Sequence, residues 1–76
     1  MKYSLWIGEQ YVQSSDEERK LKCNVTQLRT WCESMGIENM DGNVMVRDNK
    51  ADAILWQADY RMGGALHWKA PEQAKK

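Results

Sequence analysis

A glycine near the N-terminus separates two short runs of strand-forming residues, and it limits the local fold more than any other feature of this chain. The stretch Ile7-Gly8-Glu9-Gln10 suits a two-residue turn of type II′, whose first turn residue needs the positive φ that glycine adopts readily. The sequence therefore predicts an N-terminal β-hairpin. Its register pairs Ile7 with Gln10, Trp6 with Tyr11 and Leu5 with Val12.

Side chains alternate between the two faces of such a hairpin, and one predicted face is much more apolar than the other. The apolar face, expected to point to the core, carries Tyr3, Leu5, Ile7 and Val12. The mixed face carries Ser4, Trp6, Tyr11 and Gln13. Trp6 and Tyr11 would then lie side by side, away from the core. Either a partner protein or the chain's own C-terminal strand, through Trp68, would have to cover them.

Residues 16–35 are predicted to form one long amphipathic helix. Ser15-Asp16-Glu17-Glu18 has the pattern of a capping box, and Gly36-Ile37 is typical of a helix C-terminus. Asn24 leaves an alternative open, because it could cap a second, shorter helix. The apolar stripe of the predicted helix, spaced by three and four residues, consists of Leu21, Val25, Leu28, Cys32 and Met35.

Turns and shorter predicted elements make up the second half of the chain. Residues 40–43 have turn chemistry, residues 44–46 indicate a short strand, and Asp48-Asn49 could cap a helix over residues 51–62 that ends at Gly63-Gly64. Residues 51–62 could instead form a strand that turns at the two glycines. A final strand is expected over residues 65–69 and a polar tail over residues 71–76.

Together these elements predict a small α+β fold with a single globular domain over residues 1–70. Its order is an N-terminal β-hairpin, a long amphipathic helix, a short strand, a second helix and a final strand. With 76 residues, 42% of them hydrophobic and 29% charged, the chain has the composition of a globular protein with one small core.

Charge and composition make several functions improbable. The net charge is zero, so no overall field draws the chain to nucleic acid or membrane. Neither an apolar run of about 18 residues nor a leader pattern is found, so we expect a cytoplasmic protein with no membrane partner. Cys23 and Cys32 would lie on opposite sides of one helix, and His67 has no metal-ligand partner at a recognisable spacing. We expect no catalytic site, metal or cofactor, because phosphate-binding loops and nucleophile elbows are missing as well.

A series of motifs in residues 26–55 has a counterpart in known families. Leu28-Arg29 and Trp31 are followed by Gly36-Ile37, Asp41-Gly42 and Asp48. In that order they resemble the core of the winged-helix excisionase and MerR-type DNA-binding domains. The resemblance implies a DNA-binding accessory factor whose groove-facing residues are Thr26, Gln27, Arg29 and Thr30, with Asn43 on the wing.

Local charge is compatible with that resemblance. Four basic residues and no acidic one occur between positions 19 and 32, and such a patch could hold phosphates. The wing, however, has Asn43 and Val44 where these families usually carry a basic residue, and a hairpin stands where they have a helix. We therefore rank DNA binding second. The basic residues are Arg19, Lys20, Lys22 and Arg29.

The aromatic residues favour a different function. Trp, Tyr and Met are enriched in protein interfaces, and this chain has four Trp, three Tyr and five Met but no Phe. The sequence thus indicates a small non-enzymatic binding or regulatory protein that docks on a host or cognate protein. Accessory and inhibitor proteins of phages and mobile elements often have this profile. The predicted protein-binding residues are Trp6, Tyr11, Trp56, Tyr60 and Trp68.

Overall fold

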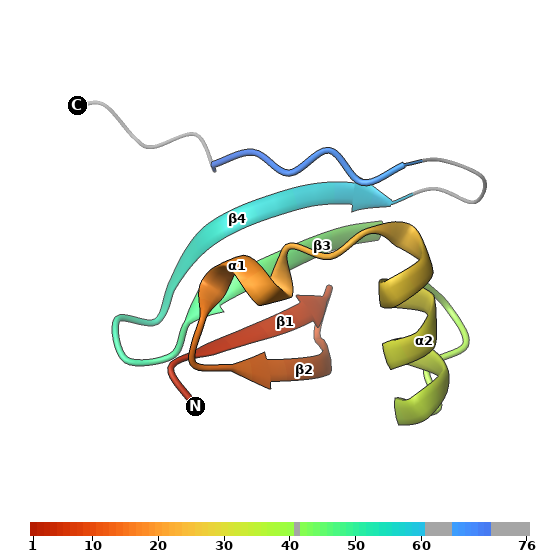
Figure 1. Cartoon of the computed structure of the whole chain (residues 1–76), viewed down its shortest axis with the longest axis horizontal. Coiled ribbons are helices and arrows are strands. Elements are labelled where there is room, and N and C mark those ends of the chain that lie inside the picture. The colour runs from red at the N-terminus through yellow and green to blue at the C-terminus, as the bar shows by residue number, and fades with distance from the viewer. Residues whose placement is uncertain (41, 61–64, 71–76) are drawn as a thin grey trace.

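The computed structural model describes residues 1–40, 42–60 and 65–70, and it confirms the α+β class (Figure 1). Four antiparallel strands form one sheet in the order β2-β1-β3-β4, so the sequence-distant β1 and β3 lie at its centre. Both helices lie on the same side of this sheet. The elements are β1 (Tyr3–Ile7), β2 (Gln10–Ser15), α1 (Glu18–Leu21), α2 (Val25–Met35), β3 (Gly42–Asp48) and β4 (Ala53–Tyr60).

The N-terminal hairpin forms with the predicted two-residue turn. Gly8 has a φ of 59°, and Ile7 pairs with Gln10 and Trp6 with Tyr11, as predicted. The predicted pairing of Leu5 with Val12 is wrong, because a β-bulge follows and Leu5 is opposite Gln13. Val12 is nevertheless buried. Val12 is the extra residue of β2 at this bulge, and the strand bends there so that the Val12 side chain still points to the apolar side of the sheet.

The single long helix over residues 16–35 is wrong, and the alternative with a second helix capped by Asn24 is correct. The backbone leaves the helical conformation after Leu21, and the Asn24 side chain accepts a hydrogen bond of 2.8 Å from the Gln27 N–H. The predicted capping box does not form either. Ser15 Oγ accepts from the Glu17 N–H at 3.0 Å, and α1 begins after Glu17 without a side-chain cap.

The predicted C-terminus of the helical region is confirmed. Gly36 adopts a left-handed conformation with a φ of 74°, and the Ile37 N–H donates to the Cys32 carbonyl over 2.9 Å. This is the bond expected of a Schellman-type ending. The predicted apolar stripe is only partly correct, because Met35 is 49% exposed whereas Leu28 and Cys32 are buried.

A second hairpin replaces the helix that was predicted over residues 51–62. β4 pairs antiparallel with β3, and the turn between them is held by Asp48, whose Oδ1 accepts from the Lys50 and Ala51 N–H groups at 3.0 and 3.1 Å. Asp52, with a φ of 55°, completes the turn. An aspartate at a helix N-cap accepts from the same two positions of the following backbone, so this local pattern fits both structures.

The C-terminal segment runs beside β4, as expected for the alternative in which residues 51–62 form a strand that turns at the two glycines. This segment is nevertheless too short to count as a strand. Gln57 and Lys69 form one isolated antiparallel bridge, with backbone hydrogen bonds of 2.9 and 3.0 Å. The predicted strand over residues 65–69 is therefore reduced to this bridge. The turn at Gly63-Gly64 and the polar tail at residues 71–76 lie outside the described residues.

The core lies between the sheet and the two helices. Alternate residues of all four strands point to the helix side of the sheet. Leu21 of α1 and Leu28 and Cys32 of α2 cover these residues and complete the core. Because the strands alternate, the residues between these core positions must point to the opposite side of the sheet. The buried strand residues of the core cluster are Leu5, Ile7, Val12, Val44, Val46 and Tyr60.

Candidate functional site

The side of the sheet opposite the helices has no described helix or strand packed on it (Figure 1). We call this side the open face. It combines large apolar and aromatic groups with polar ones, in contrast to the aliphatic core side. By strand pairing and alternation, its residues are Ser4, Trp6, Tyr11, Ser14, Asn43, Met45, Arg47, Ile54, Gln57 and Asp59.

Trp6 and Tyr11 form the aromatic contact that the hairpin register predicts. Their ring centroids are 5.6 Å apart and the planes meet at 75°, an edge-to-face arrangement. The Tyr11 hydroxyl shares a hydrogen bond with Ser14 Oγ, and the tyrosine is 39% exposed. Tyr11 is thus held by Trp6 at its ring and by Ser14 at its hydroxyl, while much of its ring surface remains accessible.

A chain of hydrogen bonds fixes the Trp6 indole. Its Nε1–H donates to Ser4 Oγ at 2.8 Å, and Ser4 Oγ donates to Asn49 Oδ1 at 2.6 Å. Asn49 in turn donates from its side chain to the Met1 carbonyl at 3.1 Å. Ser4 is buried although it belongs to the open face. The indole therefore has a satisfied N–H and a single preferred orientation before any partner binds.

Arg47, which sequence reasoning did not single out, lies against Trp6. Its guanidinium carbon is 5.7 Å from the centroid of a Trp6 ring, within the range of a cation–π contact. The Arg47 Nε is buried and has no hydrogen-bond partner in the described structure. The sequence contained only a weak indication that Arg47 lies on this face. Arg47 follows the alternation of Val44 and Val46, which puts it on the face opposite the core.

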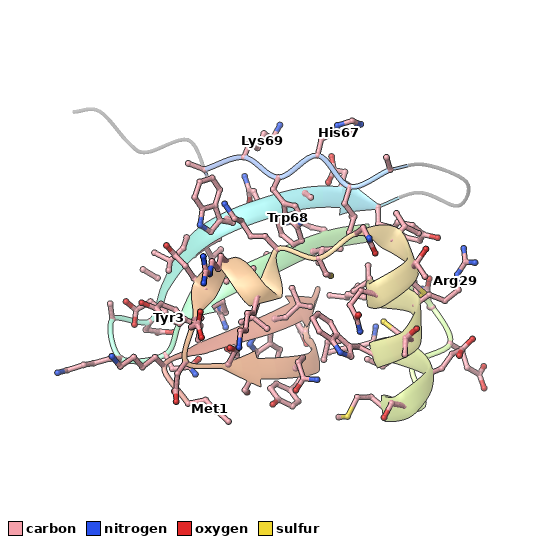
Figure 2. The ribbon with its side chains drawn as sticks, viewed as in Figure 1. Met1, Tyr3, Arg29, His67, Trp68 and Lys69 are labelled. Carbon is pink, nitrogen blue, oxygen red and sulfur yellow. The ribbon has the colours of Figure 1, made fainter. Side chains whose placement is uncertain are left out.

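The other three predicted protein-binding aromatics are on the helix side. Tyr60 is a buried member of the core, and Trp56 and Trp68 pack partly buried against it. The Trp68 indole N–H donates to the Cys23 carbonyl at 2.9 Å, whereas the neighbouring His67 and Lys69 point away (Figure 2). Trp68 consequently supports the connection between α1 and α2 and does not cover Trp6. The five predicted residues do not form one surface.

The predicted basic patch is divided in a similar way. Arg19 and Lys20 of α1 each form an ion pair of 3.3 Å with Glu17, and the hydrogen bond and charge of Lys20 lower the pKa of this exposed carboxyl. Lys22 places its ammonium 3.6 Å from the centroid of a Trp56 ring. Arg29 lies apart, on the outer side of α2 (Figure 2).

The remaining residues implied by the winged-helix resemblance are accessible. Thr26, Gln27 and Thr30 are exposed on α2 together with Arg29, and Thr30 Oγ1 donates to the Thr26 carbonyl at 3.1 Å. Asn43 is exposed in β3, on the open face, so it does not continue the surface formed by the α2 residues.

The described residues contain no group of three or more His, Cys, Asp or Glu side chains placed to hold a metal ion. Cys23 and Cys32 are both free thiols, and burial raises the pKa of Cys23 to about 11. The helices of the described chain are all too short and too polar to cross a bilayer. Comparisons of the sequence with protein families, curated proteins and solved structures found no match.

Proposed function

We propose that this chain is a small, non-enzymatic, cytoplasmic binding protein that docks its open face on a protein partner, in the manner of an accessory or inhibitor protein. One observation carries the proposal: the Trp6–Tyr11 pair, with Arg47 beside it, lies on the side of the sheet that no described helix covers. Trp, Tyr and Arg are the residue types most enriched among interface hot spots.

Preorganisation supports the same function. A side chain that must be immobilised on binding costs about 0.5–1.5 kcal/mol. Trp6 is already held by Ser4, and Tyr11 by Ser14, so the two aromatics would lose little further freedom in a complex. Met45 and Ile54 add partly buried apolar surface to the same face. The open face thus has an aromatic centre with aliphatic and polar neighbours, as stable interfaces do.

DNA binding is the competing proposal, and the exposure of four residues on α2 favours it. The helix would enter the major groove with Thr26, Gln27, Arg29 and Thr30. Arg19 and Lys20, paired with Glu17, would have to leave that carboxylate to neutralise phosphates. The two proposals use different surfaces, so substitutions can separate them.

The test is affinity capture from lysate with and without nuclease, followed by measurement of the captured protein's affinity for variants. We expect a protein whose capture survives nuclease and whose affinity falls by about 2 kcal/mol or more in Trp6→Ala, as for an interface anchor. Met35→Ala is the matched control, because Met35 is an exposed apolar residue on α2. Nuclease-sensitive capture that depends on Arg29 and not on Trp6 would support DNA binding instead.

A further inference from the structure

We infer that the open face recognises an acidic protein segment, an Asp or Glu side chain flanked by apolar residues, whose carboxylate is held by Arg47 over Trp6. This inference rests on the proposed function, since it names the chemistry of the partner that the open face would dock. Its basis is the unmet hydrogen-bonding capacity of Arg47 in the described structure.

Arg47 has a donor that lacks an acceptor. Its Nε is buried without a hydrogen-bond partner among the described residues, although buried donors are nearly always paired in proteins. Its described interaction is the contact with the Trp6 ring, which uses the cation's charge but offers no acceptor. A partner cannot reach the buried Nε itself, but the two terminal nitrogens are not buried in this way. A carboxylate is the acceptor that fits them, because it can take parallel hydrogen bonds from both terminal nitrogens of one guanidinium.

Neighbouring side chains of the open face do not meet this need. Ser4 Oγ, in the strand position opposite Arg47, accepts from Trp6 and donates to Asn49. Ile54, opposite Arg47 on the other side, has an apolar side chain. The guanidinium therefore lies between an aliphatic side chain and an aromatic one, and neither strand neighbour accepts a hydrogen bond from its Nε. A partner that supplies a carboxylate there would also bury apolar surface on Trp6 and Ile54.

Charge distribution favours a protein segment over a nucleic acid. Arg47 is the one basic residue in the four described strands, whereas binding to a phosphate backbone relies on several cations along a track. Asp59 lies on the same face and would repel a polyanion. An acidic residue within an apolar segment needs one cation and an aromatic platform, and the open face provides both.

The probe is a displayed library of random 12-residue peptides selected against the wild-type chain. We expect the selected sequences to contain Asp or Glu next to apolar residues. A synthetic peptide from this selection should bind Arg47→Gln about tenfold or more weakly, the effect of losing a charge-assisted hydrogen bond. Changing its acidic residue to the corresponding amide should weaken binding by a similar factor. Lys20→Gln is the matched control and should bind as the wild type does, because Lys20 lies on α1, away from the open face.

Reversing both charges excludes a mere folding defect. Arg47→Glu should lose the acidic peptide and bind the peptide in which Lys replaces the acidic residue, and a melting curve of each variant verifies that it folds. Selected peptides without acidic preference, unaffected by Arg47→Gln but lost in Trp6→Ala, would overturn this inference and leave the proposed function standing. Failure to select any peptide, or binding that ignores both residues, would also overturn this inference, whereas the proposed function is decided by the Trp6-dependent capture described above.

Two further outcomes would assign the open face to another occupant. Concentration-dependent dimerisation that Arg47→Gln abolishes, measured by sedimentation, would mean that a second copy of this chain covers it. Arg47-dependent binding of a DNA duplex, measured with the same variants, would mean that the guanidinium holds a phosphate. Either result overturns the inference of an acidic protein segment.

Discussion

The two faces of the sheet are built from alternate residues of the same strands, yet their side chains have very different surroundings. On the helix side Leu5, Val44 and Val46 are completely buried beneath α1 and α2. On the open face Trp6 and Arg47 contact each other while the Arg47 Nε lacks an acceptor. The proposed function assigns folding and binding to opposite faces of one small sheet. Substitutions should then affect stability on one side and affinity on the other.

The largest loss of stability is expected for Leu28→Ala. Leu28 is fully buried in α2 against the sheet, so its truncation removes apolar contacts and leaves a cavity. We expect the free energy of unfolding to fall by about 2–5 kcal/mol, measured by urea denaturation. Met35→Ala on the same helix should cost less than about 0.5 kcal/mol, because its side chain is half exposed. Equal losses in both variants would contradict the assigned orientation of α2.

A smaller loss is expected for Trp68→Ala, on the helix side. Trp68 is partly buried and joins the C-terminal segment to the Cys23 carbonyl, so truncation should lower the free energy of unfolding by about 2 kcal/mol. Trp68→Phe keeps most of the apolar contact and loses the hydrogen bond, which should cost about 1 kcal/mol. If Trp68→Ala melted like the wild type, the C-terminal segment would not be part of the folded unit.

How much of this structure the sequence could predict is clearest from the two hairpins. The first is local, and Gly8 restricts its turn to conformations with a positive φ, so the register near the turn was correct. In the second hairpin Asp48 accepts hydrogen bonds from the same two backbone N–H groups as an aspartate at a helix N-cap, so the local sequence fits a helix equally well. Pairing with β3 then decides the conformation of β4, and this tertiary preference overrides the helix propensity of residues such as Ala53 and Leu55.

The candidate site was predictable only in its local part. The contact between Trp6 and Tyr11 follows from one hairpin register and could be read from the sequence. Arg47 reaches Trp6 because β1 pairs with β3, which is about forty residues further along the chain, and no local pattern encodes that pairing. Trp56, Tyr60 and Trp68 were grouped with Trp6 by residue type alone, whereas the sheet separates them onto its other face.

Truncation of a tryptophan on the open face should lower the free energy of unfolding by no more than truncation of Trp68 on the helix side does. Trp6→Ala removes an edge-to-face ring contact worth about 0.5–1.5 kcal/mol and a cation–π contact worth about 0.5–1 kcal/mol, but it leaves the aliphatic core intact. We expect a loss of about 1–2 kcal/mol in the free protein, no larger than in Trp68→Ala, by thermal melting of both variants side by side. A loss of about 3 kcal/mol or more would place Trp6 in a structural core and contradict its role as a docking residue.

The smallest effect on the free protein is expected for Arg47→Leu. The substitution loses a cation–π contact of about 0.5–1 kcal/mol, but it also removes a buried donor without an acceptor, which costs about 1–3 kcal/mol in the native state. The two terms have opposite signs, so the unfolding midpoint in urea should stay unchanged or rise slightly. Lys20→Leu, at an exposed ion pair on α1, is the control for replacing a cation by leucine. A loss of more than about 1 kcal/mol confined to Arg47→Leu would mean that the guanidinium is satisfied within the fold, and the open face would then have no unmet donor to offer a partner.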